Sequence, residues 1–471
     1  MHWQTSYCWW LLSFCFLESG MPELSLLAIL LLAVANLISG AFGDLAWQAP
    51  LTALTFFACM YRVSHAASSR FNPTMLICAT TTLFLLSRFL ITYFAGWADY
   101  RYGDWFLMGP MDEVLVAKAL AAICLFLCGI AIVAGRLGDL PRREDSYLGT
   151  IALRMGLAIL PFTLYRVYIN VDTWRTGDYL AMYKYGGPGG IPYALGGWLI
   201  LCVFAYLASR PRLRPALAGY AVGILLCALD MFKGARGIPM AQIIGLTWLL
   251  VTTQDIRVSW WKAGAAVFSM ALLADVVGRV RIGMPITTAL TGDPFETLFG
   301  FFYGQGVSLI FVVSTLKHIA QFTPVVDGLQ STFAIFIDGY HRTFGSLPTG
   351  QTLEFAHQTA SLAHRLSFIV DAEMYLNGKG MGGSAVAESM LYTPLVGPLL
   401  AGAFTGGVLK VLYRVARMAP LGLFILAATL PFFLLIPREN QLFFVVPMCK
   451  ALLFAAIVYV IAKIHHVRQP A

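Results

Sequence analysis

The chain has 471 residues, of which 59% are apolar and only 12% are charged. Water-soluble globular proteins carry about 25% charged residues, so this composition excludes a soluble enzyme, a nucleic-acid-binding protein and a disordered chain. The formal net charge is +8, from 32 basic and 24 acidic side chains. We therefore expect an all-α polytopic membrane protein, because spanning helices satisfy their own backbone hydrogen bonds in lipid.

Apolar runs recur along the chain at the length that a bilayer requires. A span needs about 20 apolar residues, and suitable runs are centred on 24–41, 45–61, 73–96, 114–135, 150–170, 191–208, 214–231, 238–253, 261–277, 385–413, 420–436 and 441–462. These runs predict about twelve transmembrane helices. The shorter run Cys8–Leu17 cannot cross, so we expect residues 1–20 to be an interfacial tail or to precede a start at Met21.

The spans divide the chain into three parts. An N-terminal membrane bundle covers residues 1–277, a large loop covers 278–384, and a C-terminal membrane bundle covers 385–471. We expect amphipathic helices in the loop. Its apolar stretch Phe295–Leu316 is predicted to lie in the outer interface or to dip back into the protein, because a further span there would reverse the charge pattern of all later loops.

Basic residues are distributed unevenly between alternate short loops. One set of loops carries fourteen Lys and Arg residues, and the alternate set carries six. Because cytoplasmic loops are enriched in Lys and Arg, both termini are predicted to be cytoplasmic and the large loop to be external.

All nine cysteines lie in apolar runs, where we expect them to pack as small hydrophobic side chains without disulfides. The sequence contains no nucleotide-binding glycine motif, so a reaction must draw on another energy source. We expect no cofactor and no metal, because His357 and His364 have no further ligand at metal-binding spacing.

Ionisable residues at membrane depth are costly and therefore informative. Arg154, Arg166 and Lys410 lie near span ends, where long side chains reach the interface. Arg88 and Lys118 lie deeper, and we expect them to pair with backbone carbonyls or an acid rather than with substrate.

Four external junctions present arginine, or glycine together with an acid, at one membrane face. These junctions are residues 230–237, 275–281, 380–388 and 437–440. An arginine guanidinium pairs bidentately with phosphate, and glycines let backbone N–H groups approach an anion. The four junctions together are what a lipid diphosphate head group requires, whereas any one arginine alone is equally well explained by contact with phospholipid head groups.

At these junctions the sequence resembles the Wzy family of O-antigen and oligosaccharide repeat-unit polymerases, including the enterobacterial common antigen polymerase. The similar elements are Lys233–Gly237 between two mid-chain spans, Gly382–Glu388 with Gly397 after the large loop, and Pro437–Asn440 before the last span. The layout of about twelve spans with one late external loop is also similar.

The resemblance implies an inverting membrane-embedded glycosyltransferase of GT-C-like architecture in the bacterial inner membrane. Its donor and acceptor would be glycans linked to undecaprenyl diphosphate, joined at the periplasmic face. The bilayer and a chain-length regulator protein would be partners, and no nucleic acid would be bound.

Such a reaction needs cations for the leaving diphosphate and a base for the acceptor hydroxyl. We expect the diphosphate to be bound by Arg236 and Arg438, followed by Arg279, Arg281 and Lys233. Close backbone approach is expected at Gly234, Gly237, Gly382 and Gly383. The base is predicted to be Glu388 or Glu439, with His341 third because imidazole titrates near neutral pH.

Two other functions fit the sequence less well. An O-antigen ligase uses the same donor and the same external arginines, so the sequence separates it poorly from a polymerase. A flippase or polysaccharide transporter is expected to show internal repeats or broken mid-membrane helices, and the sequence has no convincing repeat.

Overall fold

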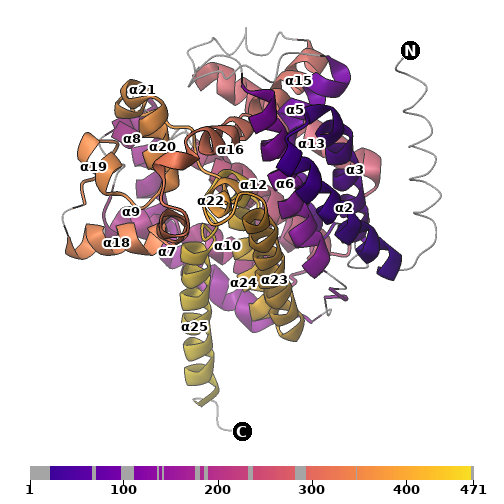
Figure 1. Ribbon diagram of the computed structural model, residues 1–471. Coiled ribbons are helices and arrows are strands. Elements are labelled where there is room, and N and C mark those ends of the chain that lie inside the picture. The colour runs from indigo at the N-terminus through magenta and orange to yellow at the C-terminus, as the bar shows by residue number, and fades with distance from the viewer. Residues whose placement is uncertain are drawn as a thin grey trace.

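The structure, a computed structural model, describes residues 22–65, 71–96, 111–134, 137–140, 143–175, 181–184, 189–231, 237–281, 293–345 and 347–467. Every regular element within these ranges is a helix. Long helices form a tilted bundle, and a lobe of short helices lies beside it (Figure 1). The expected all-α polytopic class is confirmed.

The N-terminal part contains α2 (Pro22–Phe42), α3 (Leu45–Ser64), α4 (Pro73–Thr81), the π-helical turn η1 (Thr82–Leu86), α5 (Ser87–Ala95), α6 (Glu113–Ala134), α7 (Ser146–Arg175), α8 (Ala181–Lys184), α9 (Ile191–Gly196), α10 (Leu199–Ala208), α11 (Leu213–Asp230), α12 (Gly237–Thr253) and α13 (Trp260–Arg281). The middle part contains α15 (Pro294–Gln305), α16 (Ser308–Lys317), η3 (Ile319–Gln321), α17 (Val326–Thr332), α18 (Ala334–Phe344), α19 (Leu353–Gln358), α20 (Leu362–Val370) and α21 (Ala372–Leu376). The C-terminal part contains α22 (Ala385–Met390), α23 (Val396–Met418), α24 (Pro420–Phe433), η4 (Ile436–Arg438) and α25 (Val445–Val467).

Ten helical stretches within the described residues are long and apolar enough to cross a membrane. Nine of them coincide with predicted spans. Three predicted spans have no counterpart among the ten candidate spans. The predicted span 238–253 corresponds to α12, a shorter apolar helix, and the predicted spans 45–61 and 261–277 correspond to α3 and α13.

The tenth stretch, Phe295–Lys317, is the apolar part of the large loop. It consists of α15 and α16, which are separated at Gly306, where a Cβ would overlap the backbone of Arg88. Leu309, Phe311 and Val312 on α16 are fully buried. Helix α16 thus packs inside the protein, and the stretch as a whole is also long and apolar enough to cross a membrane, which the sequence analysis did not expect.

The predicted span at 385–413 is divided in two. Helix α22 ends at Met390 and α23 begins at Val396, with a turn between them. The helix that can cross the membrane is α23, and α22 with Glu388 lies before it, outside the ten candidate spans.

Helices α6 and α23 pack closely through glycines. A Cβ on Gly129 would overlap the Leu399 carbonyl, and a Cβ on Gly402 would overlap the Phe126 carbonyl. Small residues at such contacts let two backbones approach, which provides van der Waals attraction where lipid offers no hydrophobic driving force. This contact fixes the position of α23, and with it the positions of α22 and α24.

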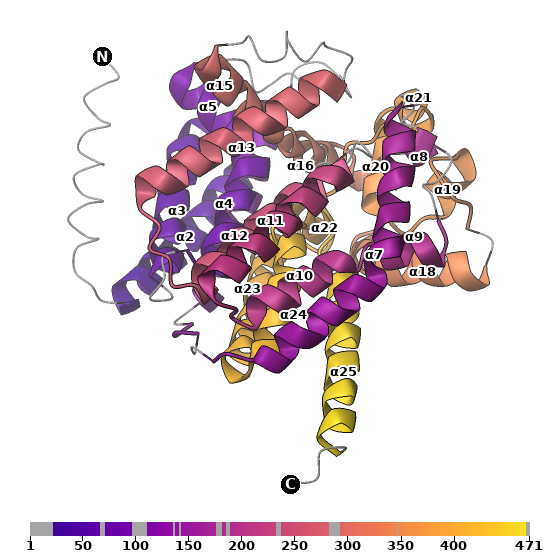
Figure 2. The ribbon, with the colours of Figure 1, turned by 180° about the vertical axis from the view of Figure 1, so that it is seen from behind.

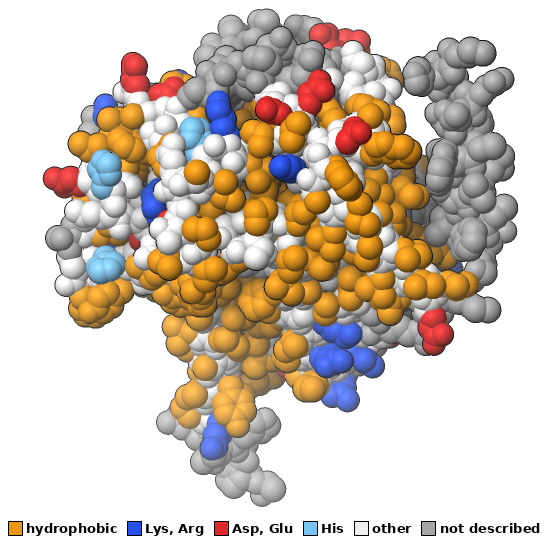
Figure 3. Space-filling model, in the orientation of Figure 1, with side chains coloured by type: hydrophobic (Ala, Val, Ile, Leu, Met, Phe, Trp, Pro, Cys, Tyr) orange, Lys and Arg blue, Asp and Glu red, His pale blue; other side chains and the backbone are white. Residues whose placement is uncertain are grey.

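The two ends of the bundle differ in charge. Figure 3 shows a broad band of hydrophobic side chains, with Lys and Arg gathered below it near the end of α23 and most of the visible acidic side chains above it. The last turns of α23 contain Arg414 and Arg417.

We predict that Gly402→Ala will destabilise the protein by about 1–3 kcal/mol, because overpacking forces α6 and α23 apart. Thermal unfolding in detergent measures the effect. The matched control is Gly407→Ala on the same helix, where a new Cβ would meet only Val133 at an ordinary 3.8 Å. Equal unfolding midpoints for the two variants would contradict the role given to Gly402.

Candidate active site

Residues 434–444 connect α24 to α25 and are called the turn below. Three segments that contain predicted site residues meet there: the glycine segment 382–383, residues 437–440 of the turn itself, and Gly237. The Gly383 N–H donates a hydrogen bond to the Arg438 carbonyl at 3.1 Å. A Cβ on Gly383 would lie 3.5 Å from Glu439, and Gly382 has a φ of +80° that favours glycine. Gly237 abuts the same region, since a Cβ there would lie 4.0 Å from Leu435.

Glu388 is the most heavily bonded carboxylate at this turn. Its side chain is only 3% exposed. Its Oε1 accepts a hydrogen bond from the Ser331 hydroxyl at 2.8 Å, and its Oε2 accepts one from the Gln441 N–H at 2.9 Å. One side chain on α22 thus connects α17 to the turn.

The two hydrogen-bond donors to Glu388 are themselves held in place. The Ser331 hydroxyl accepts a hydrogen bond from the Leu362 N–H at 3.2 Å. The Gln441 amide donates to the Thr405 hydroxyl at 2.9 Å and to the Ala401 carbonyl at 3.2 Å. Helices α17, α20 and α23 therefore all connect to the turn through this network. Neither Ser331 nor Gln441 belongs to a charged or glycine-rich motif, so sequence reasoning missed both.

Both carboxyl groups at the turn lie outside the candidate spans and have raised pKa values. Burial raises the pKa of Glu388 to about 8, although its hydrogen bonds from Gln441 and Ser331 act in the opposite direction. Burial also raises the pKa of Glu439 to about 7, against a lowering effect of Arg438. Raised carboxyl pKa values in such a place are typical of functional sites.

Arg438 is held at the edge of the turn. Its Nη1 donates to Gln305 Oε1 at 3.3 Å, and its guanidinium lies 5.7 Å from the centre of the Phe84 ring. Arg438 remains partly exposed. The turn therefore presents a cation beside two carboxyl groups.

Helix α15 also contacts the fully buried Arg88. The Arg88 Nη2 donates to the Tyr303 hydroxyl at 2.7 Å, and the guanidinium lies 4.1 Å from the centre of the Tyr303 ring. A phenol stacked on the cation is a partner that the sequence analysis did not name for Arg88. Helix α15 thus contacts both arginines, through Tyr303 and Gln305.

The remaining predicted site residues are placed elsewhere or lie outside the described residues. His341 is exposed on α18, with its ring 5.6 Å from that of Tyr340. Lys233, Gly234 and Arg236 lie outside the described residues, and Arg279 and Arg281 end α13 with side chains that are not described.

His364 is the buried histidine of the lobe. Its Nδ1 lies 3.1 Å from the Tyr375 hydroxyl, and burial lowers its pKa to about 4. Among the described residues, no three His, Cys, Asp or Glu side chains are grouped as metal ligands.

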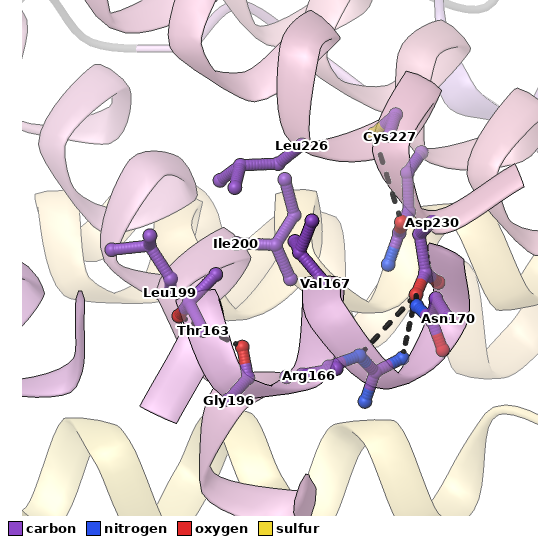
Figure 4. A pocket seen from close by; sticks show the side chains of 12 residues that line it. Thr163, Arg166, Val167, Asn170, Gly196, Leu199, Ile200, Leu226, Cys227 and Asp230 are labelled. Carbon is purple, nitrogen blue, oxygen red and sulfur yellow. Dashed lines mark hydrogen bonds and ion pairs between the residues drawn. The ribbon is translucent and has the colours of Figure 1, made fainter. Parts of the chain in front are cut away.

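A second polar cluster lies between α7 and α11 (Figure 4). Arg166 forms an ion pair with Asp230 at 2.9 Å, and Asn170 donates to the same carboxylate oxygen at 3.0 Å. Arg166 therefore pairs with an acid at the end of the candidate span Leu213–Asp230, a partner that the sequence analysis did not name. The pairing arises because Asp230 lies at the C-terminal end of α11, where a negative charge is unfavourable beside the helix dipole and needs a cation.

The pocket beside this ion pair has a volume of about 50 Å³. A cavity needs about 10–15 Å³ of such volume to hold one water molecule, so the pocket has room for water. The ion pair ties α11 to α7, and the turn at Arg438, where the glycine segment and two carboxyl groups meet, is the candidate active site.

A family model described as O-antigen polysaccharide polymerase Wzy matches residues 24–467. The match covers α2 through α25, including the turn that contains Arg438 and Glu439. No curated protein and no solved structure matches the chain.

We predict that Glu388→Gln will remove part of the pH dependence of stability. The folded-state pKa of Glu388 is about 8 and its ordinary value is 4.5. Folding therefore favours the protonated carboxyl. Its contribution to the free energy of unfolding is complete below pH 4.5 and is lost as the pH rises through 8. Between pH 4.5 and pH 8, the free energy of unfolding falls by about 1.4 kcal/mol for each unit by which the pH rises.

Thermal unfolding of the detergent-solubilised protein at several pH values between 5 and 8 measures this effect. The wild-type midpoint should fall more steeply with rising pH than that of Glu388→Gln. Glu439 is present in both proteins, so the pH dependence of stability that Glu439 causes remains in the variant. Parallel curves for the two proteins would rule out a raised pKa at Glu388.

Proposed function

The chain belongs to the O-antigen polysaccharide polymerase Wzy family, and on this premise we propose that the Arg438 turn joins lipid-linked glycans. Members of the family polymerise polysaccharide repeat units in a membrane. The proposed donor is a growing glycan on undecaprenyl diphosphate, and the proposed acceptor is a new repeat unit on a second carrier.

One observation carries the proposal. The glycine segment 382–383 packs directly on Arg438 and Glu439, which brings a cation, two carboxyl groups and accessible backbone into one place. A glycosyl transfer from a diphosphate needs positive charge at the leaving group and a base at the attacking hydroxyl. Arg438 and the carboxyl groups supply these two kinds of group.

We assign the base to Glu439 rather than to Glu388. Both oxygens of Glu388 already accept hydrogen bonds, and its side chain is nearly inaccessible. Glu439 is partly exposed, and its pKa of about 7 is close to the working pH that suits a general base. Glu388 then acts as a positioning residue, and the exposed His341 stays a third candidate.

In the proposed step, the ionised Glu439 takes the proton of the acceptor hydroxyl. The hydroxyl oxygen attacks the anomeric carbon of the donor from the face opposite the diphosphate. The bond from that carbon to the diphosphate oxygen breaks, and the diphosphate leaves with the electron pair towards Arg438. The configuration at the anomeric carbon is inverted.

Further cations complete the proposed diphosphate site. Lys233 and Arg236 precede Gly237, which abuts Leu435 beside the turn. Arg279 and Arg281 at the end of α13 are further candidates. The glycines Gly234, Gly237 and Gly382 would give the anion access to backbone N–H groups, whereas the N–H of Gly383 already donates to the Arg438 carbonyl.

The proposed location is the bacterial inner membrane, with both termini cytoplasmic and the active site periplasmic. The excess of Lys and Arg in one set of short loops supports this orientation. A chain-length regulator is a proposed protein partner.

A deletion of the gene tests the proposed function against its nearest rival. We predict that the host will make lipid A core capped with a single repeat unit, because attachment remains while chain growth stops. Gel electrophoresis of the surface glycolipid shows this directly. Bare core would indicate a ligase instead, and accumulation of unexported lipid-linked repeat units would indicate a flippase.

We predict that Glu439→Gln will reduce chain elongation about 10²- to 10⁴-fold, as expected for loss of a general base. Arg438→Ala should abolish long chains as well, with the protein still inserted in the membrane. Complementation of the deletion strain, read as the glycan ladder, measures both.

The matched controls are Glu354→Gln on α19 and Arg414→Ala at the far end of α23, which should keep full ladders. A full ladder from Glu439→Gln together with none from Glu388→Gln would move the base to Glu388. Full ladders from all variants at the turn would refute this site.

A further inference from the structure

An uninterrupted apolar stripe runs along α17 and α18, outside the ten candidate spans. The Phe333 N–H donates to the Leu329 carbonyl and the Ile337 N–H donates to the Phe333 carbonyl, so the two helices are nearly continuous. Spacings of three and four residues place the stripe on one helix face. Its members are Val326, Leu329, Phe333, Phe336, Tyr340 and Phe344.

The stripe is unusually exposed for apolar side chains of this size. The exposed fraction is 50% for Phe336, 62% for Tyr340 and 77% for Phe344. Exposed apolar residues on a spanning helix face lipid and need no further cover. The same residues on a helix outside the spans indicate a surface that is covered by the membrane or by another protein.

The opposite face of α18 holds the lobe together. The carboxylate of Asp338 accepts hydrogen bonds from the Thr359 hydroxyl at 2.6 Å and from the Ala360 N–H at 2.9 Å. The guanidinium of Arg342 lies 5.4 Å from the centre of the Phe355 ring. The charged face of α18 is therefore turned towards α19 and α20, and the aromatic face is turned outwards.

The direction of α18 distinguishes it from the spans. In both Figure 1 and Figure 2, α18 runs across the direction of α25 and lies level with the upper end of that helix. Helix α25 contains the candidate span Val445–Ile464 and begins just after the turn with Arg438 and Glu439. If α25 crosses the bilayer, its upper end marks one surface of the bilayer, and α18 lies across the span at that level.

We infer that α17 and α18 bind the lipid surface, with the aromatic stripe inserted among the acyl chains and headgroups of the leaflet next to the active-site turn. Amphipathic helices lie in this interface with their apolar face buried about 5–10 Å deep. Phe and Tyr suit the position, because aromatic side chains concentrate at membrane interfaces. Helix α18 has eleven residues and covers about 16 Å of the surface.

This contact would fix the lobe relative to the active site. Ser331 on α17 donates the hydrogen bond to Glu388, and Glu388 accepts the second one from Gln441 at the turn. A helix that rests on the bilayer through one face thus connects through the other to the network around the turn. The inference does not depend on the proposed reaction, because it concerns lipid contact alone.

Spin labelling of the full-length protein in lipid nanodiscs tests the inference. Single cysteines are introduced as Phe336→Cys and Phe344→Cys and labelled with a nitroxide. The background has Cys8, Cys15 and Cys449 replaced by Ser, since Cys449 is exposed and the other six cysteines of the described part are buried. Power saturation then compares collisions with oxygen, which enters lipid, and with a water-soluble nickel chelate.

Two reference positions calibrate the measurement. Leu453→Cys is exposed within the candidate span of α25 and reports lipid, and Glu354→Cys is exposed on α19 of the lobe and reports water. Labels at 336 and 344 should favour oxygen over the chelate several-fold more than the label at 354. Their depth should be shallower than that of the label at 453.

Two results would overturn the inference. Labels at 336 and 344 that match the label at 354 would mean that the stripe faces water. Labels that collide with neither reagent would mean that protein covers the stripe, and dipolar coupling between labels on two molecules would then identify a second copy of this chain as the cover.

Discussion

The carboxylate of Glu388 is the interaction on which the candidate site depends. It accepts one hydrogen bond from α17 and one from the turn after α24, although it lies on α22 in a buried position. A buried carboxyl without such donors is costly, because few groups replace the water that it loses. Moving the residues around Glu388 would break these hydrogen bonds at that energetic cost, so their arrangement is stabilised. The same arrangement places Arg438 and Glu439 at the partly exposed edge of the turn.

Close backbone packing makes this arrangement possible. Gly383 lets its own segment hydrogen-bond to the Arg438 carbonyl, and Gly402 lets α23 approach α6 without a side chain between them. Gln441 then connects the turn to α23 through Thr405. The close approach of α23 to α6 at Gly402 thus helps to position the charged groups of the turn, because tightly packed helices move as rigid units.

Buried charge in this protein follows two patterns. Arg166 and Asp230 neutralise each other in an ion pair that lines a small pocket. Arg438 is held by the neutral Gln305 and lies beside the carboxyl group of Glu439, which has a raised pKa. The ion pair joins α7 to α11, whereas the cation and the carboxyl groups at the turn adjoin a glycine segment. This contrast is why we place the proposed chemistry at the turn.

The sequence by itself determined the all-α polytopic class, nine of the ten apolar stretches and the elements around Gly383, Glu388 and Arg438, because apolar runs and motif residues are local properties of the chain. Only the tertiary structure decided that the predicted span at 385–413 is divided, that α16 is buried and that Arg166 pairs with Asp230. It alone also identified Ser331 and Gln441 as the partners of Glu388. Such pairings depend on how helices far apart in the chain approach and rotate against one another, and the periodicity of a single helix does not contain that information.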